Sequence, residues 1–487
     1  MKHPYQCVVA LERVGSQEVK LLLAASAHNL LCIDLTAGEI RSIWSAASPS
    51  NAPPDGQQPE TPEGPPEKKR KVSEDSAQHP RIIKLVASHD GQHIVAVTGE
   101  DKRVHVFFLD PSGTLEHLSE RSMPKRPCAI AVTQDDQTIL CADKFGDVYA
   151  LPLQHTSEDE QAFATKAEQA PKTFVPSATN LTVHTARNRK ALEAQLKQQE
   201  TQAKSKEPLR FKHELLLGHV SMLTDLLFVT LDAEDLRAES NVPAAKPRNY
   251  ILTADRDEHI RISRGQPQSH VIEGFCLGHK EFISKMCLAT PHALVSGGGD
   301  DHLFVWDWLK GRLLRKISLR DILSSIPDAG EFAGEKRRDL SIAVSGIWGV
   351  PQTAKEKRAI LVALEGVPAL ISISAEALHS EEPIQATAMP TSGNVLDVAA
   401  GSDGLIISVD NFHVPGSMTD RRAEQEAEQA ARLLWADSAI VEGAMSGKEQ
   451  LGRANRLDTA ETSNSDGLGE LLYGIANLRK RGGGGDE

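Results

Sequence analysis

The chain has 487 residues, of which 40% are hydrophobic and only 4% aromatic, and its 54 Lys and Arg are outnumbered by 67 Asp and Glu, for a formal net charge of −13. A protein that neutralises many nucleic-acid phosphates on its own surface normally shows the opposite charge balance. The scarcity of aromatic side chains also disfavours a platform on which bases stack. Composition therefore argues against independent nucleic-acid binding by this chain.

Six cysteines are scattered along the chain without a Cys-x-x-Cys pair, and each lies in or beside an apolar run: Cys7, Cys32, Cys128, Cys141, Cys276 and Cys287. In such surroundings a free thiol behaves as a small buried hydrophobe, which fits a reducing compartment. No apolar run approaches the ~20 residues that span a bilayer. The opening MKHPYQCVVALERVG has too short an apolar core for a secretory signal. We expect a soluble, intracellular protein with no membrane contact.

The parts of the chain with apolar character are runs of strand length separated by Asp, Gly, Asn and Gln turns. None of them shows convincing helical periodicity. Short strands at regular spacing with turn signals between them are typical of a sandwich, a barrel or a propeller. In chain order the runs are 21–35, 81–110, 128–153, 282–308, 360–374 and 394–410.

An internal repeat distinguishes between these architectures. The stretches VTGEDKRVHVF, LTADRDEHIRIS and SGGGDDHLFVW align on Asp101, Asp257 and Asp300, and in each a β-rich strand follows the Asp. Gly-His pairs lie upstream of the second and third stretches, at 218–219 and 278–279. Gly-His followed by Asp and then Trp-Asp is the signature of WD repeats. The sequence therefore predicts an all-β fold, a WD-repeat β-propeller of about seven blades.

The most complete repeat predicts a side-chain network within one blade, formed by His279, Ser296, Asp300 and Trp306. Hydrogen bonds between these side chains fix strand register in a small sheet that would otherwise slip. His219 holds the His position of the preceding repeat. We interpret these residues as structural, in preference to a general base at either His or a metal pair at Asp300 and Asp301.

Polar segments interrupt the strands at 47–79, 154–210 and 232–247, and the chain turns polar again from about 418. Segments of this composition cannot bury enough apolar surface to fold independently. We therefore expect the propeller to occupy residues 1–417 with disordered loop insertions, followed by a polar, partly helical or disordered tail over 418–487. The basic stretch 187–206 and the Arg-Lys-Arg near the C-terminus are secondary candidates for phosphate contacts.

A compact basic cluster stands out against the acidic background in the first insertion, within PPEKKRKVSED at 65–75. Its four cations are Lys68, Lys69, Arg70 and Lys71. An extended basic peptide of this kind is typical of a nuclear-import signal that lies in an acidic groove of importin. A solvated charge run is the plainer alternative. We predict a nuclear protein.

No motif for catalysis is present in the sequence. A methyl-donor or dinucleotide site needs a Gly-rich turn between a strand and a helix, whereas SGGGDD leads into a strand and GGGG lies in the tail. Motifs for phosphate binding, zinc-dependent hydrolysis and nucleophilic serine chemistry are also missing. We predict no catalytic residue, no metal site and no cofactor in this chain.

Four stretches resemble a specific family: ADKFGDVYALPL (142–153), LLLGHVSMLTDLLF (215–228), ILTADRDEHIRIS (251–263) and FCLGHKEFIS (275–284). In this order they are similar to the WD-repeat, non-catalytic subunit of the tRNA (guanine-N7)-methyltransferase in its fungal-type form. Ser263 stands where a WD repeat has Trp, while Arg256, Glu258 and Arg261 are kept. The similarity spans most of 1–411 and is weakest in the insertions and the tail.

The resemblance implies a function. The propeller would stabilise, as a heterodimer, a separate catalytic subunit that carries S-adenosylmethionine and methylates N7 of a guanosine in the tRNA variable loop, with tRNA bound mainly by the partner. The family's partner contact maps onto Asp257, Glu258 and Arg261, and Lys144 on the neighbouring blade joins them. A general WD scaffold, such as a ubiquitin-ligase substrate receptor or a chromatin-complex subunit, is an alternative, because the fold serves many roles. A propeller hydrolase is a third.

Overall fold

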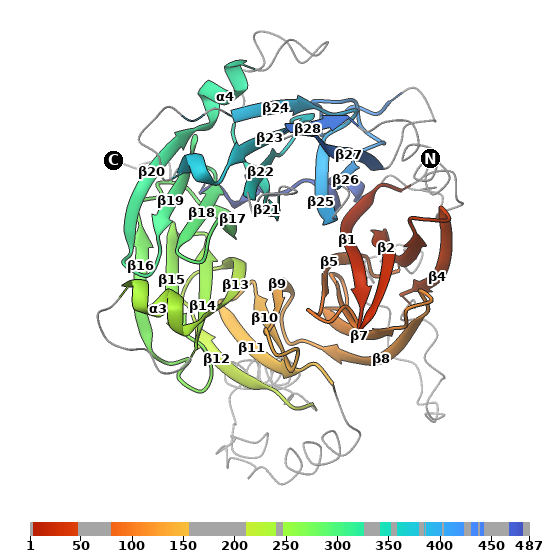
Figure 1. The fold of residues 1–487 in the computed structure, drawn as a ribbon, viewed down its shortest axis with the longest axis horizontal. Helices are drawn as coiled ribbons and strands as arrows, with labels where there is room; N and C mark the ends of the chain where they lie inside the picture. The colour runs from red at the N-terminus through yellow and green to blue at the C-terminus, as the bar shows by residue number, and fades with distance from the viewer. Residues whose placement is uncertain are drawn as a thin grey trace, which may run out of the picture.

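The computed structural model describes residues 3–46, 79–154, 211–239, 247–325, 341–351, 358–378, 384, 386–401, 404–422, 430–436, 439–442 and 467–480. Within them, antiparallel four-stranded sheets stand like blades around a central axis (Figure 1). Strands that follow one another along the chain are neighbours in each sheet. The innermost strands contact one another in a closed ring, so the last sheet packs against the first.

The first four blades lie in chain order around this ring. Blade 1 comprises β1 (Tyr5–Val14), β2 (Gln17–Ser26), β3 (Asn29–Asp34) and β4 (Glu39–Ser45). Blade 2 comprises β5 (Ile82–Ala87), β6 (His93–Thr98), β7 (Arg103–Leu109) and β8 (Leu115–Ser122). Blade 3 comprises β9 (Pro127–Val132), β10 (Thr138–Asp143), β11 (Asp147–Pro152) and β12 (Glu214–Gly218). Blade 4 comprises β13 (Leu223–Leu231), β14 (Arg248–Asp255), β15 (His259–Arg264) and β16 (Ile272–Leu277).

The remaining sheets complete the ring. Blade 5 comprises β17 (Ile283–Leu288), β18 (Ala293–Gly298), β19 (His302–Asp307) and β20 (Arg312–Ser318). Blade 6 comprises β21 (Val344–Pro351), β22 (Arg358–Leu364), β23 (Ala369–Ser374) and β24 (Ala386–Pro390). The closing sheet comprises β25 (Val395–Gly401), β26 (Gly404–Val409), β27 (Ala430–Ala436) and β28 (Ala439–Glu442). The few helices described are α3 (Ala233–Glu239), α4 (Leu319–Ser325), η3 (Glu376–Leu378), α7 (Leu468–Leu472) and η4 (Ala476–Leu478).

The expected architecture, seven blades within residues 1–417 followed by a separate polar tail, is wrong. Six blades are complete before residue 418, and the last of them ends at Pro390. The closing sheet is a composite, because its outer strands β27 and β28 come from the region assigned to the tail. Without them, the N–H and C=O groups along the edge of β26 would have no strand partner. The segment AARLLWA has a helical sequence pattern but forms β27, because pairing with β26 outweighs its local preference.

The insertions differ in what the structure describes. Almost all of 47–79 and 154–210 lies outside the described residues. The third insertion, 232–247, is partly folded, because α3 covers its beginning and Leu236 is only 5% exposed in a cluster with Trp308 of blade 5. No helix among the described residues is long and apolar enough to cross a membrane.

The core lies between adjacent blades. Val295 and Val305 of blade 5, for example, share one buried cluster with Val362 and Ile371 of blade 6. Because a middle strand is covered on both faces by neighbouring blades, it is apolar at nearly every position, as in the wholly buried β6. This explains why the sequence shows continuous apolar runs where a half-exposed sheet would show alternation.

Candidate partner-binding face

The four residues expected to form a network in blade 5 lie together. His279 Nδ1 is 2.7 Å from Asp300 Oδ2, and its Nε2 is 2.7 Å from the hydroxyl of Ser296. The indole N–H of Trp306 donates to the same hydroxyl at 2.8 Å. Burial lowers the pKa of His279 although the hydrogen bond from its ring to Asp300 opposes the shift. Every polar atom of this imidazole is engaged within the blade, so the network acts as a strut.

Blade 4 carries a modified version of this network. Thr253 Oγ1 lies 3.2 Å from His219 Nε2, but the Trp position is occupied by the buried Ser263. Arg261 compensates for the missing indole, because its Nε donates to Ser263 Oγ at 3.0 Å and its Nη1 donates to the carbonyl of Gly218 at 3.0 Å. Burial lowers the pKa of Arg261. This guanidinium is therefore held at a fixed place beside the edge strand of blade 3.

Loops of blades 3 and 4 meet at this place. The N–H of His219 donates to the carbonyl of Gly146 at 2.9 Å, and the N–H of Arg256 donates to the carbonyl of Met222 at 2.9 Å. Lys144 lies exposed in the turn before Gly146, and partial desolvation of its ammonium, with repulsion from Arg126, lowers its pKa. The predicted contact residues Lys144, Asp257, Glu258 and Arg261 thus belong to loops and strands that touch one another.

Exposed apolar side chains surround these charges. Phe145, next to Lys144, is 64% exposed, and Val220 in the adjoining loop is fully exposed. Phe275 pairs with Arg261 across β15 and β16, and Leu277 pairs with His259; both apolar side chains are more than 40% exposed. We call the four predicted contact residues and these four apolar residues the docking rim. Apolar side chains around fixed charges are typical of protein interfaces.

The C-terminal residues 467–480, which we call the strap, cross the face on which these loops lie. The strap begins beside blade 2, where Arg81 Nη1 donates to the carbonyl of Gly467 at 2.7 Å. The hydroxyl of Tyr473 then bonds the carboxylate of Asp410 and accepts from the amide of Asn394, both in the closing sheet's loops. The N–H groups of residues 474, 475 and 476 all donate to Glu365 in blade 6, at 2.6, 2.9 and 2.8 Å.

The strap ends on the docking rim. Arg479 donates to the carbonyls of Gly299 and Ile342 at 3.0 and 2.9 Å and pairs with Glu281 at 3.2 Å. Lys480 Nζ lies 2.9 Å from Glu258 and 3.2 Å from Asp257. Hydrogen bonds to Glu258 and Asp257 raise the pKa of Lys480, so its ammonium group is charged at neutral pH.

The sequence analysis missed the strap and considered its Arg-Lys only as a secondary candidate for phosphate contacts. In the structure both cations are paired with carboxylates of blades 4 and 5. The available signal was GLGELLYGIANL at 467–478, an apolar run inside a polar tail. The predicted import signal, Lys68 to Lys71, lies outside the described residues.

Comparisons with known proteins agree with this architecture. A family model described as "tRNA methyltransferase TRM82 WD40 domain" matches residues 22–434, a range that includes most of β27. Solved structures of RRP9 WD40 repeats and of U3-55K each superpose with a TM-score of 0.50 over 88% of this chain and cover 93% and 94% of their own chains. Their identities of 12% and 13% bear on the fold alone.

Two relatives match over nearly the full length of both chains. A protein of Phaeosphaeria nodorum is 42% identical, with 99% of each chain covered, and a protein of Aspergillus oryzae is 38% identical, with 99% of this chain and 98% of the relative covered. Both are named tRNA (guanine-N(7)-)-methyltransferase non-catalytic subunit TRM82. This chain therefore belongs to the TRM82 family of WD40 proteins, the non-catalytic subunits of tRNA (guanine-N7)-methyltransferase.

Proposed function

We propose that this chain binds a separate catalytic subunit through the docking rim and stabilises the conformation in which that subunit methylates N7 of a guanosine in the tRNA variable loop. S-adenosylmethionine and most of the tRNA contacts belong to the partner in this proposal, in keeping with the acidic balance of this chain. The observation that carries it is the placing of the acid pair Asp257 and Glu258 beside the anchored Arg261 and exposed apolar side chains.

The rim is suited to holding a partner in one orientation. Arg261 is fixed by two hydrogen bonds, and Glu258 lies on a tight turn, so little side-chain entropy is lost on docking. Apolar residues supply burial, while charges of both signs select the partner's register. A ligand that binds one conformation of a protein selectively increases the population of that conformation. Binding alone can therefore support catalysis by the partner.

Docking competes with the strap. Asp257 and Glu258 are already paired with Lys480, so a cation of the partner must replace this ammonium. Exchange of one exposed ion pair for another changes the free energy little, because such pairs contribute at most about 1 kcal/mol. We infer that apolar contacts of the rim supply most of the affinity, and that the charges supply specificity.

The decisive experiment reverses charges on the rim. The double variant D257K/E258K should lose capture of the catalytic subunit by at least about 100-fold, because like charges brought together at an interface cost several kcal/mol. The matched control E273K reverses another exposed carboxylate of blade 4, on β16, and should bind as the wild type does. Co-purification and N7-methylguanosine content of tRNA are measured in cells that lack the native chain. Wild-type capture and methylation by the double variant would refute the proposal.

We also propose that the basic cluster Lys68 to Lys71 directs the protein to the nucleus through importin. A fluorescently tagged chain without residues 65–75 should shift to the cytoplasm. The control is a full-length chain in which the residues of 65–75 outside KKRK are scrambled, and it should remain nuclear. Unchanged nuclear fluorescence of the deletion would show that the cluster is not the signal.

A further inference from the structure

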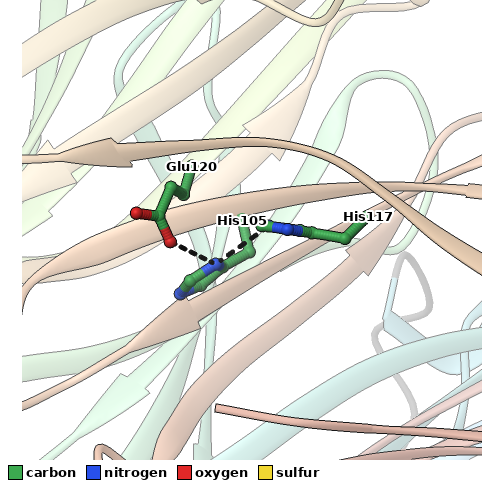
Figure 2. A group of neighbouring side chains, drawn as sticks. All are labelled: His105, His117 and Glu120. Carbon is green, nitrogen blue, oxygen red and sulfur yellow. Dashed lines mark hydrogen bonds and ion pairs between the residues drawn. The ribbon is translucent and has the colours of Figure 1, made fainter. Parts of the chain in front are cut away.

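A β-bulge in blade 2 brings three potential ligands onto one face of the sheet. His105 pairs with Glu120 and Phe107 pairs with His117 across β7 and β8, and the register shifts between these two pairs. Side chains alternate along a regular strand, so His117 and Glu120, three positions apart, would point to opposite faces. The extra residue of the bulge restores a common face. Figure 2 shows both side chains converging on His105.

The separations of the donor atoms suit a small tetrahedral ion. His105 Nδ1 lies 3.3 Å from His117 Nε2 and 3.9 Å from Glu120 Oε2, and all three donor atoms lie within 4.8 Å of one another. A tetrahedral Zn²⁺ with bonds of about 2.0–2.1 Å separates its ligand atoms by about 3.3–3.4 Å. The two imidazoles already have this spacing. Glu120 is 48% exposed, so its side chain has room to move: Oε2 must approach His105 Nδ1 by about half an ångström, and His117 Nε2, now within 4.8 Å, must come to the same spacing.

The hydrogen bonds around His105 favour the tautomer that can bind a metal through Nδ1. His105 Nε2 lies 3.4 Å from Thr98 Oγ1, and the Thr98 hydroxyl donates to Asp101. The Thr98 oxygen is thus left to accept the Nε2 proton of His105, which directs the Nδ1 lone pair toward His117 and Glu120.

The surroundings shield one side of the cluster and leave the other open. The ring centroid of Trp44 lies 4.8 Å from that of His105 and 5.7 Å from that of His117, and the centroids of Phe107 and His117 are 5.1 Å apart. Arg103 Nη1 currently donates to both oxygens of Glu120 at 3.2 Å. Because the Arg103 side chain is 38% exposed, it can withdraw into water when a cation arrives. Glu120 then supplies the anionic ligand.

We propose that His105, His117 and Glu120 form a binding site for one divalent transition-metal ion, with zinc the best fit, which links β7 to the bulged outer strand β8. Two imidazoles and one carboxylate are ligands that zinc accepts, and a water completes the tetrahedron on the open side. A hard cation such as Mg²⁺ is disfavoured, because it prefers oxygen ligands. The sequence predicted no metal, since a bulge that realigns two residues leaves no recognisable spacing.

The test uses the full-length chain after treatment with a chelator and dialysis. We expect one equivalent of Zn²⁺ to bind through His105, His117 and Glu120 and to raise the Tm of the chain. When Co²⁺ replaces Zn²⁺, the protein should show the visible absorption of tetrahedral cobalt. The variants H117A and E120A should each weaken Zn²⁺ binding at least about tenfold and abolish the cobalt spectrum. Both residues are on an outer strand, so circular dichroism should confirm that the variants fold.

Matched controls exclude other His and Glu residues. E116A removes another exposed carboxylate of β8, and H213A removes a half-buried imidazole of blade 3; both should bind zinc as the wild type does. Absence of bound zinc, zinc binding that neither H117A nor E120A weakens, or binding of Mg²⁺ in preference to Zn²⁺ would each overturn the proposal. None of these measurements needs the catalytic subunit, so the outcome is independent of the proposed function.

Discussion

Glu258 has a backbone conformation that costs stability, at a position that we propose contacts the catalytic subunit. Its φ is +75°, in the left-handed region that disfavours residues with a Cβ. The corresponding turn of blade 3 has Gly146 at φ +104°, where a Cβ would lie 2.3 Å from the carbonyl oxygen of His219. Strain held at a particular residue is a reason to look for a function there. In the proposed function, the side chain held here presents a carboxylate to the catalytic subunit.

The variant E258G separates stability from binding. Relief of the left-handed conformation should raise the free energy of unfolding by up to about 1 kcal/mol, while the lost carboxylate should weaken capture of the catalytic subunit. Denaturant titration and a pull-down measure the two effects. The control K102G relieves a left-handed residue, at φ +60°, in the corresponding turn of blade 2 and should leave capture unchanged. Undiminished capture by E258G would contradict the role assigned to this carboxylate.

The strut in blade 5 gives a second prediction about single residues. S296A removes the hydroxyl that Trp306 and His279 share, so two buried polar groups lose their partner. We expect a loss of about 2–3 kcal/mol in the free energy of unfolding. S112A, which removes an exposed hydroxyl bonded to Asp110, should cost less than about 0.5 kcal/mol. Equal effects of the two substitutions on urea-induced unfolding would show that the network contributes little.

At the scale of elements, the strap is attached at its start by the buried Leu468 and over residues 473–480 by a series of polar contacts. Glu365 accepts three consecutive backbone N–H groups at the start of η4, and Arg479 donates to two backbone carbonyls of other blades. Such contacts can be exchanged for water without opening the hydrophobic core. We therefore expect residues 473–480 to leave the rim more readily than the blades unfold.

Release of the strap can be measured directly. In E365A the amides of residues 474–476 should exchange hydrogen at least about tenfold faster. Because Lys480 then competes less for Asp257 and Glu258, capture of the catalytic subunit should increase. The control E470A removes an exposed carboxylate within α7 and should leave both properties unchanged. Hydrogen exchange read by mass spectrometry decides the matter: protection of the strap that persists in E365A would disprove this anchoring.

At the scale of the whole molecule, stability depends on closure of the ring between the first and last sheets. The backbone N–H of Val8 in β1 donates to Asp397 of β25 at 2.8 Å, and the hydroxyl of Ser408 in β26 donates to the carbonyl of Tyr5. Asp225 of β13 makes a similar bond, accepting from the N–H of Met286 in β17 at 2.8 Å. Hydrogen bonds from one blade to the next thus recur around the axis and join the two ends of the propeller.

His3 lies beside this closure and should make stability sensitive to acid. Burial lowers its pKa to about 4, from an ordinary value near 6.5, although its bond to Pro4 opposes the shift. The unfolded chain therefore takes up a proton at a pH where the folded chain does not, and stability falls as the pH decreases from about 6.5 to 4. Tm measured from pH 7.5 to 4.5 should fall less steeply for H3N than for the wild type. Parallel Tm curves would show that His3 does not control this dependence.

The sequence alone determined the propeller fold and the family. Two Gly-His pairs and an aligned Asp recur at the spacing of WD repeats, one of which ends in Trp306-Asp307, and ADKFGD and LTADRDEHIRIS mark out the loops that form the docking rim. These signals are readable because the interactions behind them are local to a blade or to two adjacent blades. The residues of His279's strut could be named for the same reason.

Only the tertiary structure decided how residues 430–442 and 467–480 are used, and which face His117 and Glu120 share. Residues 430–436 and 439–442 complete a sheet that begins at residue 395. Lys480 at the end of 467–480 pairs with carboxylates of blade 4. The shared face of His117 and Glu120 depends on a one-residue bulge. In each case the deciding contact joins a strand edge, a backbone N–H or a charge to a group that the local sequence does not contain. These hydrogen-bonding groups and charges find partners in parts of the chain that only the closed ring brings close, and a local sequence pattern does not contain that information.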